Sequence, residues 1–124
     1  LIKRNFNIFK KILENNIDGV IDTFSSNSEN FSYVSLDDNG LVEKIVEKKV
    51  ISNRATSGLY VFSNYNTYRN CYRKINFNNK ELFISDVYTQ AISLKLKIFN
   101  IHNDDPRNTI ILGTPLEYEN WINK

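Results

Sequence analysis

Apolar residues recur along the chain with two different periods, and these predict alternating helices and strands. Near the start, four apolar residues spaced as on one face of a helix predict a helix over residues 6–16. Short alternating or continuous apolar runs then predict strands at residues 20–24, 31–36, 41–47 and 54–62. The last of these runs is predicted to be a central strand, because its second half is nearly all apolar or aromatic.

Turn residues and the second half of the chain complete the pattern. Asn39-Gly40 predicts a type I′ hairpin between the second and third strands, because both central residues of that turn need a positive φ. Farther along, the same periods predict helices at residues 65–74 and from Ser85, as the N-cap, to about Leu94, and short strands at 97–101 and 109–112.

A final helix is marked by its capping residues. Thr114 is a good N-cap, Pro115 occupies the first helical position, and Glu117 follows three residues after the cap, which together form a capping box. The order of elements predicts an α/β fold with a mixed sheet flanked by helices, in one domain over residues 1–124.

The composition and charge of the chain argue against nucleic acid as a binding partner. The 124 residues are 41% hydrophobic and carry a formal net charge of +2, enough for a core but too small a charge to favour nucleic acid. Basic and acidic residues are interspersed, except for a cluster near the start that we expect on a solvated helix face: Lys3, Arg4, Lys10 and Lys11. No basic stripe with interleaved aromatic residues is present.

The single cysteine and the absence of long apolar runs favour a location in the cytoplasm. Cys71 cannot form an intramolecular disulfide, and we expect it in the core or on a helix face. No apolar run approaches about 18 residues, and no signal peptide is recognised. We therefore expect a cytoplasmic protein without a membrane span. The chain starts at Leu1 without a methionine, so we expect it to begin inside a longer protein or after processing.

The sequence does not support three other kinds of functional site: a phosphate loop, a catalytic histidine and a calcium loop. No glycine-rich phosphate loop occurs. The one histidine, His102, has no Ser, Cys or metal-ligand partner at a useful spacing, so we interpret it as a loop residue that can pair with Asp104 or Asp105. Residues 37–40 look like part of a calcium loop but lack its terminal glutamate.

The chemically most informative stretch joins the end of one predicted strand to the next. Glu47-Lys48 closes the first strand and Ser57-Gly58 opens into the apolar part of the second. A carboxylate accepts hydrogen bonds from hydroxyls, an ammonium meets a phosphate, and a glycine lets a ring approach the backbone, which suits a phosphorylated polyol. The alternative is a solvated strand end followed by a glycine bulge.

These motifs occur in an order that resembles the C-terminal half of the sugar-phosphate nucleotidyltransferases, the nucleoside-diphosphate-sugar pyrophosphorylase superfamily. Glucose-1-phosphate thymidylyltransferase is its familiar member, and capsule-locus and phosphocholine-type cytidylyltransferases are similar too. The resemblance covers roughly residues 15–124 and rests on Gly19-Val20-Ile21 with Thr23-Phe24, Tyr33-Val34, Asn39-Gly40, Glu47-Lys48, Ser57-Gly58-Leu59-Tyr60, Ser85-Asp86-Val87-Tyr88 and Leu112-Gly113-Thr114-Pro115.

The resemblance implies a role for five residues. Glu47 would bind hydroxyls of the phosphorylated substrate, and Lys48 would meet its phosphate. Gly58 would let the backbone approach the sugar, and Tyr60 would line the same pocket. Asp86 would hold Mg²⁺ together with a second aspartate upstream, so Lys48 and Asp86 are the implied catalytic residues. The alternative for Asp86 is a helix-start aspartate stabilised by the helix dipole.

The resemblance also implies what is missing. The family's nucleotide-binding half, with its glycine-rich loop and first strands, has no counterpart here. The whole enzyme would be a Mg²⁺-dependent nucleotidyltransferase using an NTP and a sugar-1-phosphate or similar phosphorylated alcohol for surface polysaccharide, and the isolated chain would be inactive. An exposed sheet edge would favour self-association. The alternative is a non-catalytic binding or oligomerisation module that kept the fold and lost the reaction.

Overall fold

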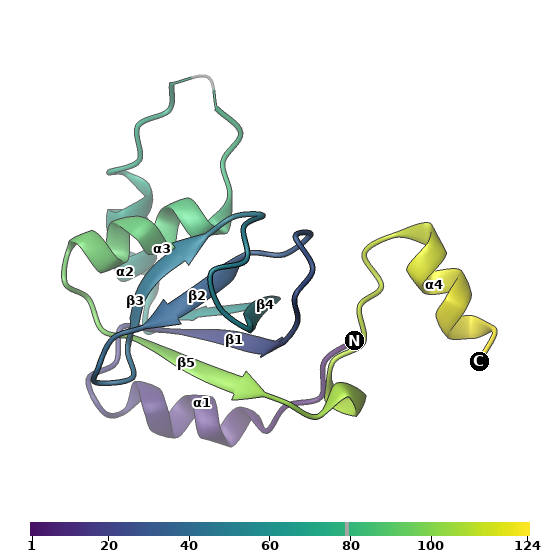
Figure 1. The fold of residues 1–124 in the computed structure, drawn as a ribbon. Helices are drawn as coiled ribbons and strands as arrows, with labels where there is room; N and C mark the ends of the chain where they lie inside the picture. The colour runs from purple at the N-terminus through teal and green to yellow at the C-terminus, as the bar shows by residue number, and fades with distance from the viewer. Residues whose placement is uncertain (79) are drawn as a thin grey trace.

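Five strands form one mixed sheet in the order β3-β2-β4-β1-β5, as the computed structural model shows for residues 1–78 and 80–124 (Figure 1). β1 pairs with β4 in antiparallel and with β5 in parallel orientation, and β2 pairs with β3 and β4 in antiparallel orientation. The predicted mixed α/β sheet is confirmed, with β4 in the interior. The strands are β1 (Gly19–Ser25), β2 (Tyr33–Leu36), β3 (Val42–Val46), β4 (Arg54–Phe62) and β5 (Ile98–Asn103).

Helices cover both faces of the sheet. α1 (Phe6–Leu13) lies on one face, and α2 (Tyr65–Tyr72) and α3 (Ile84–Ser93) lie on the other (Figure 1). A single 3₁₀ turn (Pro106–Asn108) follows β5. The last helix, α4 (Pro115–Ile122), projects away from the sheet, and none of its residues is buried. Within the described residues, no helix combines the length and the apolar character needed to cross a membrane.

The main core lies between the sheet and α3. Tyr88 of α3 is fully buried, and its ring stacks on Phe62 with 4.5 Å between the centroids. Its hydroxyl donates to the backbone oxygen of Val61 at 2.8 Å, so the polar end of the ring is satisfied. Cys71 of α2 is buried in the same cluster, as predicted, and burial raises the pKa of its thiol.

The hairpin forms where Asn39-Gly40 predicts it, but the turn type is different. Of residues 37–40, only Gly40 has a positive φ, +79°. Its N–H donates to the backbone oxygen of Asp37 at 3.0 Å. The Asp37 carboxylate also accepts the N–H groups of Asn39 and Leu41, each at 2.9 Å. This pattern is that of a type I turn followed by a left-handed glycine, which lets Asn39 keep an ordinary negative φ.

Two other expectations about elements are wrong. The predicted strand at residues 109–112 is reduced to an isolated bridge between Ile2 and Thr109, next to which Leu1 and Ile110 exchange backbone hydrogen bonds. Ser85 does not cap α3. The helix begins at Ile84, and Phe83 is the N-cap residue, whose N–H donates to the Asp86 carboxylate at 3.0 Å. The Thr114–Glu117 capping box of α4 is confirmed.

Gly19 at the start of β1 is predicted to be essential for packing. A Cβ there would lie 2.9 Å from the backbone oxygen of Val61, which cannot move without disturbing β4. Gly19→Ala should lower the free energy of unfolding by about 1–3 kcal/mol, measured by urea denaturation. Gly113→Ala is the control, because the nearest atom would be 3.7 Å away. Equal stability of the two variants would contradict this packing argument.

Candidate functional site

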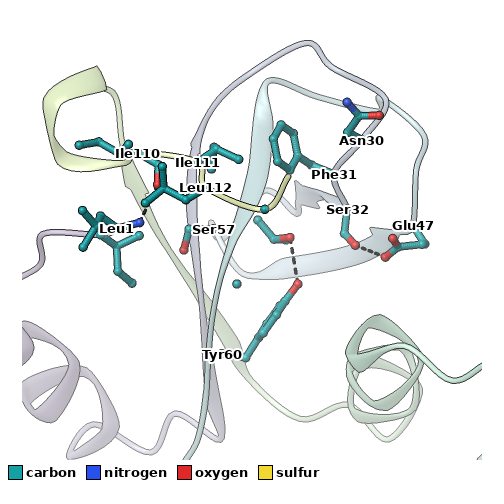
Figure 2. Close-up of a pocket in the computed structure, with 14 residues that line it drawn as sticks. Leu1, Asn30, Phe31, Ser32, Glu47, Ser57, Tyr60, Ile110, Ile111 and Leu112 are labelled. Atoms are coloured by element: carbon teal, nitrogen blue, oxygen red, sulfur yellow. Dashed lines mark hydrogen bonds between the residues drawn. The ribbon is translucent and has the colours of Figure 1, made fainter. Parts of the chain in front are cut away.

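An open hollow of about 480 Å³ lies where the ends of β2, β3 and β4 meet the N-terminal segment and residues 110–113 (Figure 2). One wall is polar and comes from the sheet. The opposite wall is largely apolar and comes from residues 1–2 and 110–112. Three of the predicted site residues, Glu47, Gly58 and Tyr60, line this hollow together.

Strand pairing brings the polar wall together. Tyr33 of β2 is paired with Val46 of β3, so Ser32 and Glu47, which flank that pair, meet at the same end of the sheet. The Ser32 hydroxyl donates a hydrogen bond to the Glu47 carboxylate (Figure 2). The strand ends therefore present a carboxylate that already accepts from one hydroxyl and has further lone pairs open to the hollow.

Tyr60 adds a phenol to this wall. Its hydroxyl donates to the Thr56 hydroxyl at 2.9 Å, and its ring packs 5.6 Å from the ring of Tyr88. Burial raises the pKa of Tyr60, the hydrogen bond between the Tyr60 and Thr56 hydroxyls opposes that shift, and the nearby charge of Glu47 adds to it. Glu47, Thr56 and Tyr60 thus form one electrostatically connected group.

Gly58 forms the floor of the hollow within a β-bulge. The pairing of β1 with β4 shifts from Ile21–Tyr60 to Thr23–Thr56, so residues 57–59 bulge out opposite a single β1 residue. Gly58 has a φ of +92°, and no heavy atom lies within 4 Å of where its Cβ would be. The glycine-bulge interpretation is confirmed, and this bulge also exposes backbone to the hollow, which suits a ligand that approaches closely.

Lys48 does not line the hollow with its neighbour Glu47. Its φ is +52°, so the chain turns sharply after β3 and the two consecutive side chains diverge. The exposed Lys48 ammonium lies 5.9 Å from the centroid of the Phe83 ring, next to the start of α3. An exposed contact of this kind is worth about 0.5–1 kcal/mol, so the side chain can leave it at little cost.

Asp86 also lies outside the hollow, and its carboxylate accepts a hydrogen bond at the start of its own helix, α3. Its carboxylate accepts from the Phe83 N–H and lies 3.4 Å from the Lys80 ammonium. These contacts are those of a helix-start aspartate. Among the described residues, no group of three or more His, Cys, Asp or Glu side chains could hold a metal ion. Asp86 alone therefore does not make a Mg²⁺ site, and it would need a carboxylate from elsewhere.

A buried ion pair that no sequence pattern predicted lies next to the hollow. Arg4 and Asp22 have side chains that are 3% and 0% exposed, and two N–H···O contacts of 2.6 and 2.8 Å join them. The expectation that Arg4 lies on a solvated helix face is wrong, because it precedes α1 in an extended segment that runs beside residues 108–110. An aspartate inside a strand of buried residues was the available clue, since a buried carboxylate needs a partner.

The interpretation of His102 as a loop residue is wrong, because it lies in β5 and pairs with Thr23 of β1. Polar neighbours hold its ring. Its Nδ1 lies 2.9 Å from the Thr23 hydroxyl, and its Nε2 lies 2.8 Å from Asp104, so the predicted pairing with Asp104 is confirmed. The hydrogen bond from Ser25, and then the nearby His102, lower the pKa of Asp104. Because Ser25 and Asp104 both lie on the Nε2 side, the group lacks the geometry of a Ser-His-Asp triad.

Known structures share this fold. The nucleoside-diphosphate-sugar pyrophosphorylase from Vibrio cholerae RC9 superposes with a TM-score of 0.80 and 25% identity, over 91% of this chain and 49% of that one. A Bacillus anthracis protein described as a glucose-1-phosphate thymidylyltransferase, crystallised with sucrose, superposes with a TM-score of 0.66 and 16% identity, over 84% of this chain and 43% of that one. No protein-family model and no curated protein sequence matches.

The fold is therefore that of about half of a sugar nucleotidyltransferase, which confirms the resemblance found in the sequence. The chain spans about half the length of the two structures it matches.

Tyr60 should make stability sensitive to alkaline pH. Its folded pKa is raised above the ordinary 10.0, so its contribution to stability is complete below pH 10.0 and is lost as the pH rises toward the folded pKa. Replacing Tyr60 by Phe should make this alkaline loss shallower in urea denaturation across the pH range. Replacing the exposed Tyr65 by Phe is the control. An unchanged pH dependence in Tyr60→Phe would contradict the assigned environment.

Proposed function

We propose that this chain is the C-terminal, substrate-binding portion of a nucleotidyltransferase that acts on a sugar-1-phosphate or a similar phosphorylated alcohol. The observation that carries this proposal is the convergence of Glu47, Gly58 and Tyr60 on one hollow, within a fold that matches half of a sugar nucleotidyltransferase. The reaction would take place in the cytoplasm and would transfer a nucleotidyl group from an NTP. Its nucleotide-activated product would be used to make surface polysaccharide.

The hollow has the chemistry of a site for hydroxyl groups. Glu47 accepts hydrogen bonds, and the hydroxyls of Ser32, Thr56 and Tyr60 can donate or accept them. The exposed backbone at Gly58 leaves room for a ring, and the apolar side chains of residues 110–112 would cover the carbon face of that ring. Glu47 is the one charged side chain among the described lining residues, so a phosphate would be repelled from the hollow itself.

The phosphate would lie outside the hollow, toward the start of α3. Lys48 follows Glu47 directly and could turn from the Phe83 ring to neutralise phosphate oxygens. Asp86 lies at the same helix start and would contribute one oxygen to Mg²⁺, with a second aspartate supplied from outside these residues. When bound, Mg²⁺ would neutralise charge that develops on the phosphates.

The nucleotide would be bound by polypeptide equivalent to the other half of the related structures. Apolar surface next to the hollow is available for such packing. Leu1 is 62% exposed, and α4 exposes four large apolar residues, Leu116, Tyr118, Trp121 and Ile122. The same surface favours the second candidate function, a non-catalytic module that binds or oligomerises through it. Light scattering at high concentration tests self-association, and a clean monomer would count against that module.

Binding calorimetry tests the proposed site. The panel consists of sugar-1-phosphates and phosphocholine, each with and without Mg²⁺. Glu47→Gln should weaken binding of a sugar-1-phosphate by about tenfold or more, because hydrogen bonds to a charged group contribute about 1.5–3 kcal/mol. Glu43→Gln is the matched control, since Glu43 is exposed on β3 away from the hollow. Equal affinity of the two variants would remove Glu47 from the site.

Asp86 can be tested for its two roles separately. Asp86→Ala removes the acceptor of the Phe83 N–H and should lower the free energy of unfolding by about 0.5–2 kcal/mol. If Asp86 also holds Mg²⁺, the substitution should abolish turnover by the full-length protein, as should Lys48→Ala. Full turnover in both variants would contradict the catalytic roles proposed for Lys48 and Asp86.

A further inference from the structure

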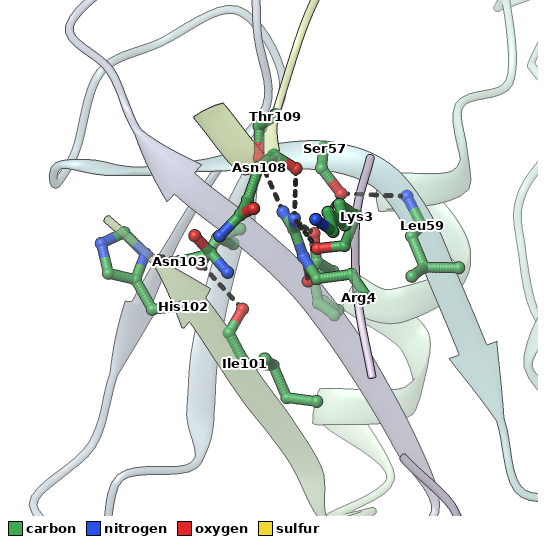
Figure 3. A network of polar contacts seen from close by, with 12 residues as sticks. Lys3, Arg4, Ser57, Leu59, Ile101, His102, Asn103, Asn108 and Thr109 are labelled. Atoms are coloured by element: carbon green, nitrogen blue, oxygen red, sulfur yellow. Dashed lines mark hydrogen bonds and ion pairs between the residues drawn. The ribbon is translucent and has the colours of Figure 1, made fainter. Parts of the chain in front are cut away.

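Three segments far apart in the sequence make up most of the hollow. They are the N-terminal residues 1–2, the bulge at 57–59 and residues 110–113. Backbone hydrogen bonds between Leu1 and Ile110 join two of them, and the bulge takes no part in that pairing. All three lie next to residues bonded to the buried pair of Arg4 and Asp22: Arg4 follows residues 1–3 and binds Asn108 and Thr109, and Asp22 binds Ser57. Figure 3 shows Arg4 with Asn108 and Thr109. We propose that Arg4 and Asp22 are positioning residues, which hold these walls in place around the candidate site.

Asp22 fixes the bulge. It lies on β1 directly opposite the three bulged residues of β4, and its Oδ2 accepts from the Ser57 hydroxyl as well as from Arg4. The Ser57 oxygen in turn accepts from the Leu59 N–H at 3.4 Å (Figure 3). The carboxylate thus replaces the strand pairing that the bulge loses, and it sets the backbone on both sides of Gly58.

Arg4 fixes the other two segments. Its Nη1 donates to the backbone oxygens of Asn108 at 2.6 Å and Lys3 at 3.0 Å, and its Nη2 donates to the Thr109 hydroxyl at 2.7 Å. With the two bonds to Asp22, all five N–H donors of the guanidinium are used. Because residues 110–113 follow Thr109 directly, their path along the hollow starts from this anchor.

An ion pair is not required here for stability alone. Well-packed apolar residues of similar volume often replace a buried ion pair without loss of stability. Apolar side chains could not, however, bond to Ser57, Asn108 and Thr109 at once. Positioning and simple stabilisation therefore predict different results when the pair is replaced by apolar residues, and this difference can be measured.

The test compares the 124-residue chain with its double variant Arg4→Met/Asp22→Leu. We expect a urea midpoint close to that of the parent chain, together with amide hydrogen exchange at least about tenfold faster at residues 58–60 and 110–113, while β1 and β5 keep their protection. Unchanged exchange in these two segments would overturn the positioning role.

A second variant covers the case in which the double variant does not fold. Ser57→Ala leaves the ion pair intact and removes the bond from the bulge to Asp22. Exchange should accelerate at Gly58 and remain unchanged at 110–113. Leu59 is not diagnostic, because its N–H donates to the Ser57 oxygen that the substitution removes. Ser35→Ala, at a serine on β2 outside the hollow, is the matched control. If Ser57→Ala behaved like Ser35→Ala, Asp22 would not position the bulge.

Ligand binding adds a readout that rests on the proposed function. If the parent chain binds a sugar-1-phosphate, the double variant should bind it about tenfold more weakly although Glu47 is intact. Equal affinity in the double variant would contradict the positioning role of Arg4 and Asp22 and would leave the proposed function intact. Failure of the parent chain to bind any sugar-1-phosphate would count against the proposed function, and the exchange measurement would still decide the role of Arg4 and Asp22.

Discussion

The buried contact between Arg4 and Asp22 is the constraint on which the candidate site depends. A carboxylate in the middle of a sheet costs several kcal/mol unless a charge and hydrogen bonds compensate it. Here the guanidinium of Arg4 and the hydroxyl of Ser57 do so, and both belong to segments that form walls of the hollow. The contacts that offset the cost of burying Asp22 therefore also hold the walls of the hollow in place.

The candidate site divides its chemistry by position. The strand ends supply Glu47 and the hydroxyls of Ser32, Thr56 and Tyr60, and this side suits a polyol. The cation and the second carboxylate, Lys48 and Asp86, lie outside the hollow near the start of α3. Such a division fits a substrate with hydroxyls at one end and a phosphate at the other. Under the proposed function, the other groups of the reaction site would come from polypeptide equivalent to the remaining half of the related structures.

Local patterns predicted the elements well, and tertiary contacts account for the errors. β4 and α4 follow from an apolar run and a capping box, both of which are local. The turn at residues 37–40 differs from the prediction because the Asp37 side chain supports a type I turn. Glu47, Gly58 and Tyr60 line one hollow, because β2 lies between β3 and β4 and pairs with both, whereas Lys48 lies outside it. The place of Arg4 depends on Asp22, Asn108 and Thr109, which no sequence period connects to it.

We propose that the hollow binds the hydroxyl-bearing part of a phosphorylated alcohol. Backbone amide chemical shifts during a titration of the isotope-labelled chain with a sugar-1-phosphate test it most directly. Binding in the hollow should concentrate the changes at Ser32, Glu47, residues 57–60 and residues 111–113, with a smaller group at Lys48. Changes confined to other surfaces, or no changes at millimolar ligand, would contradict it.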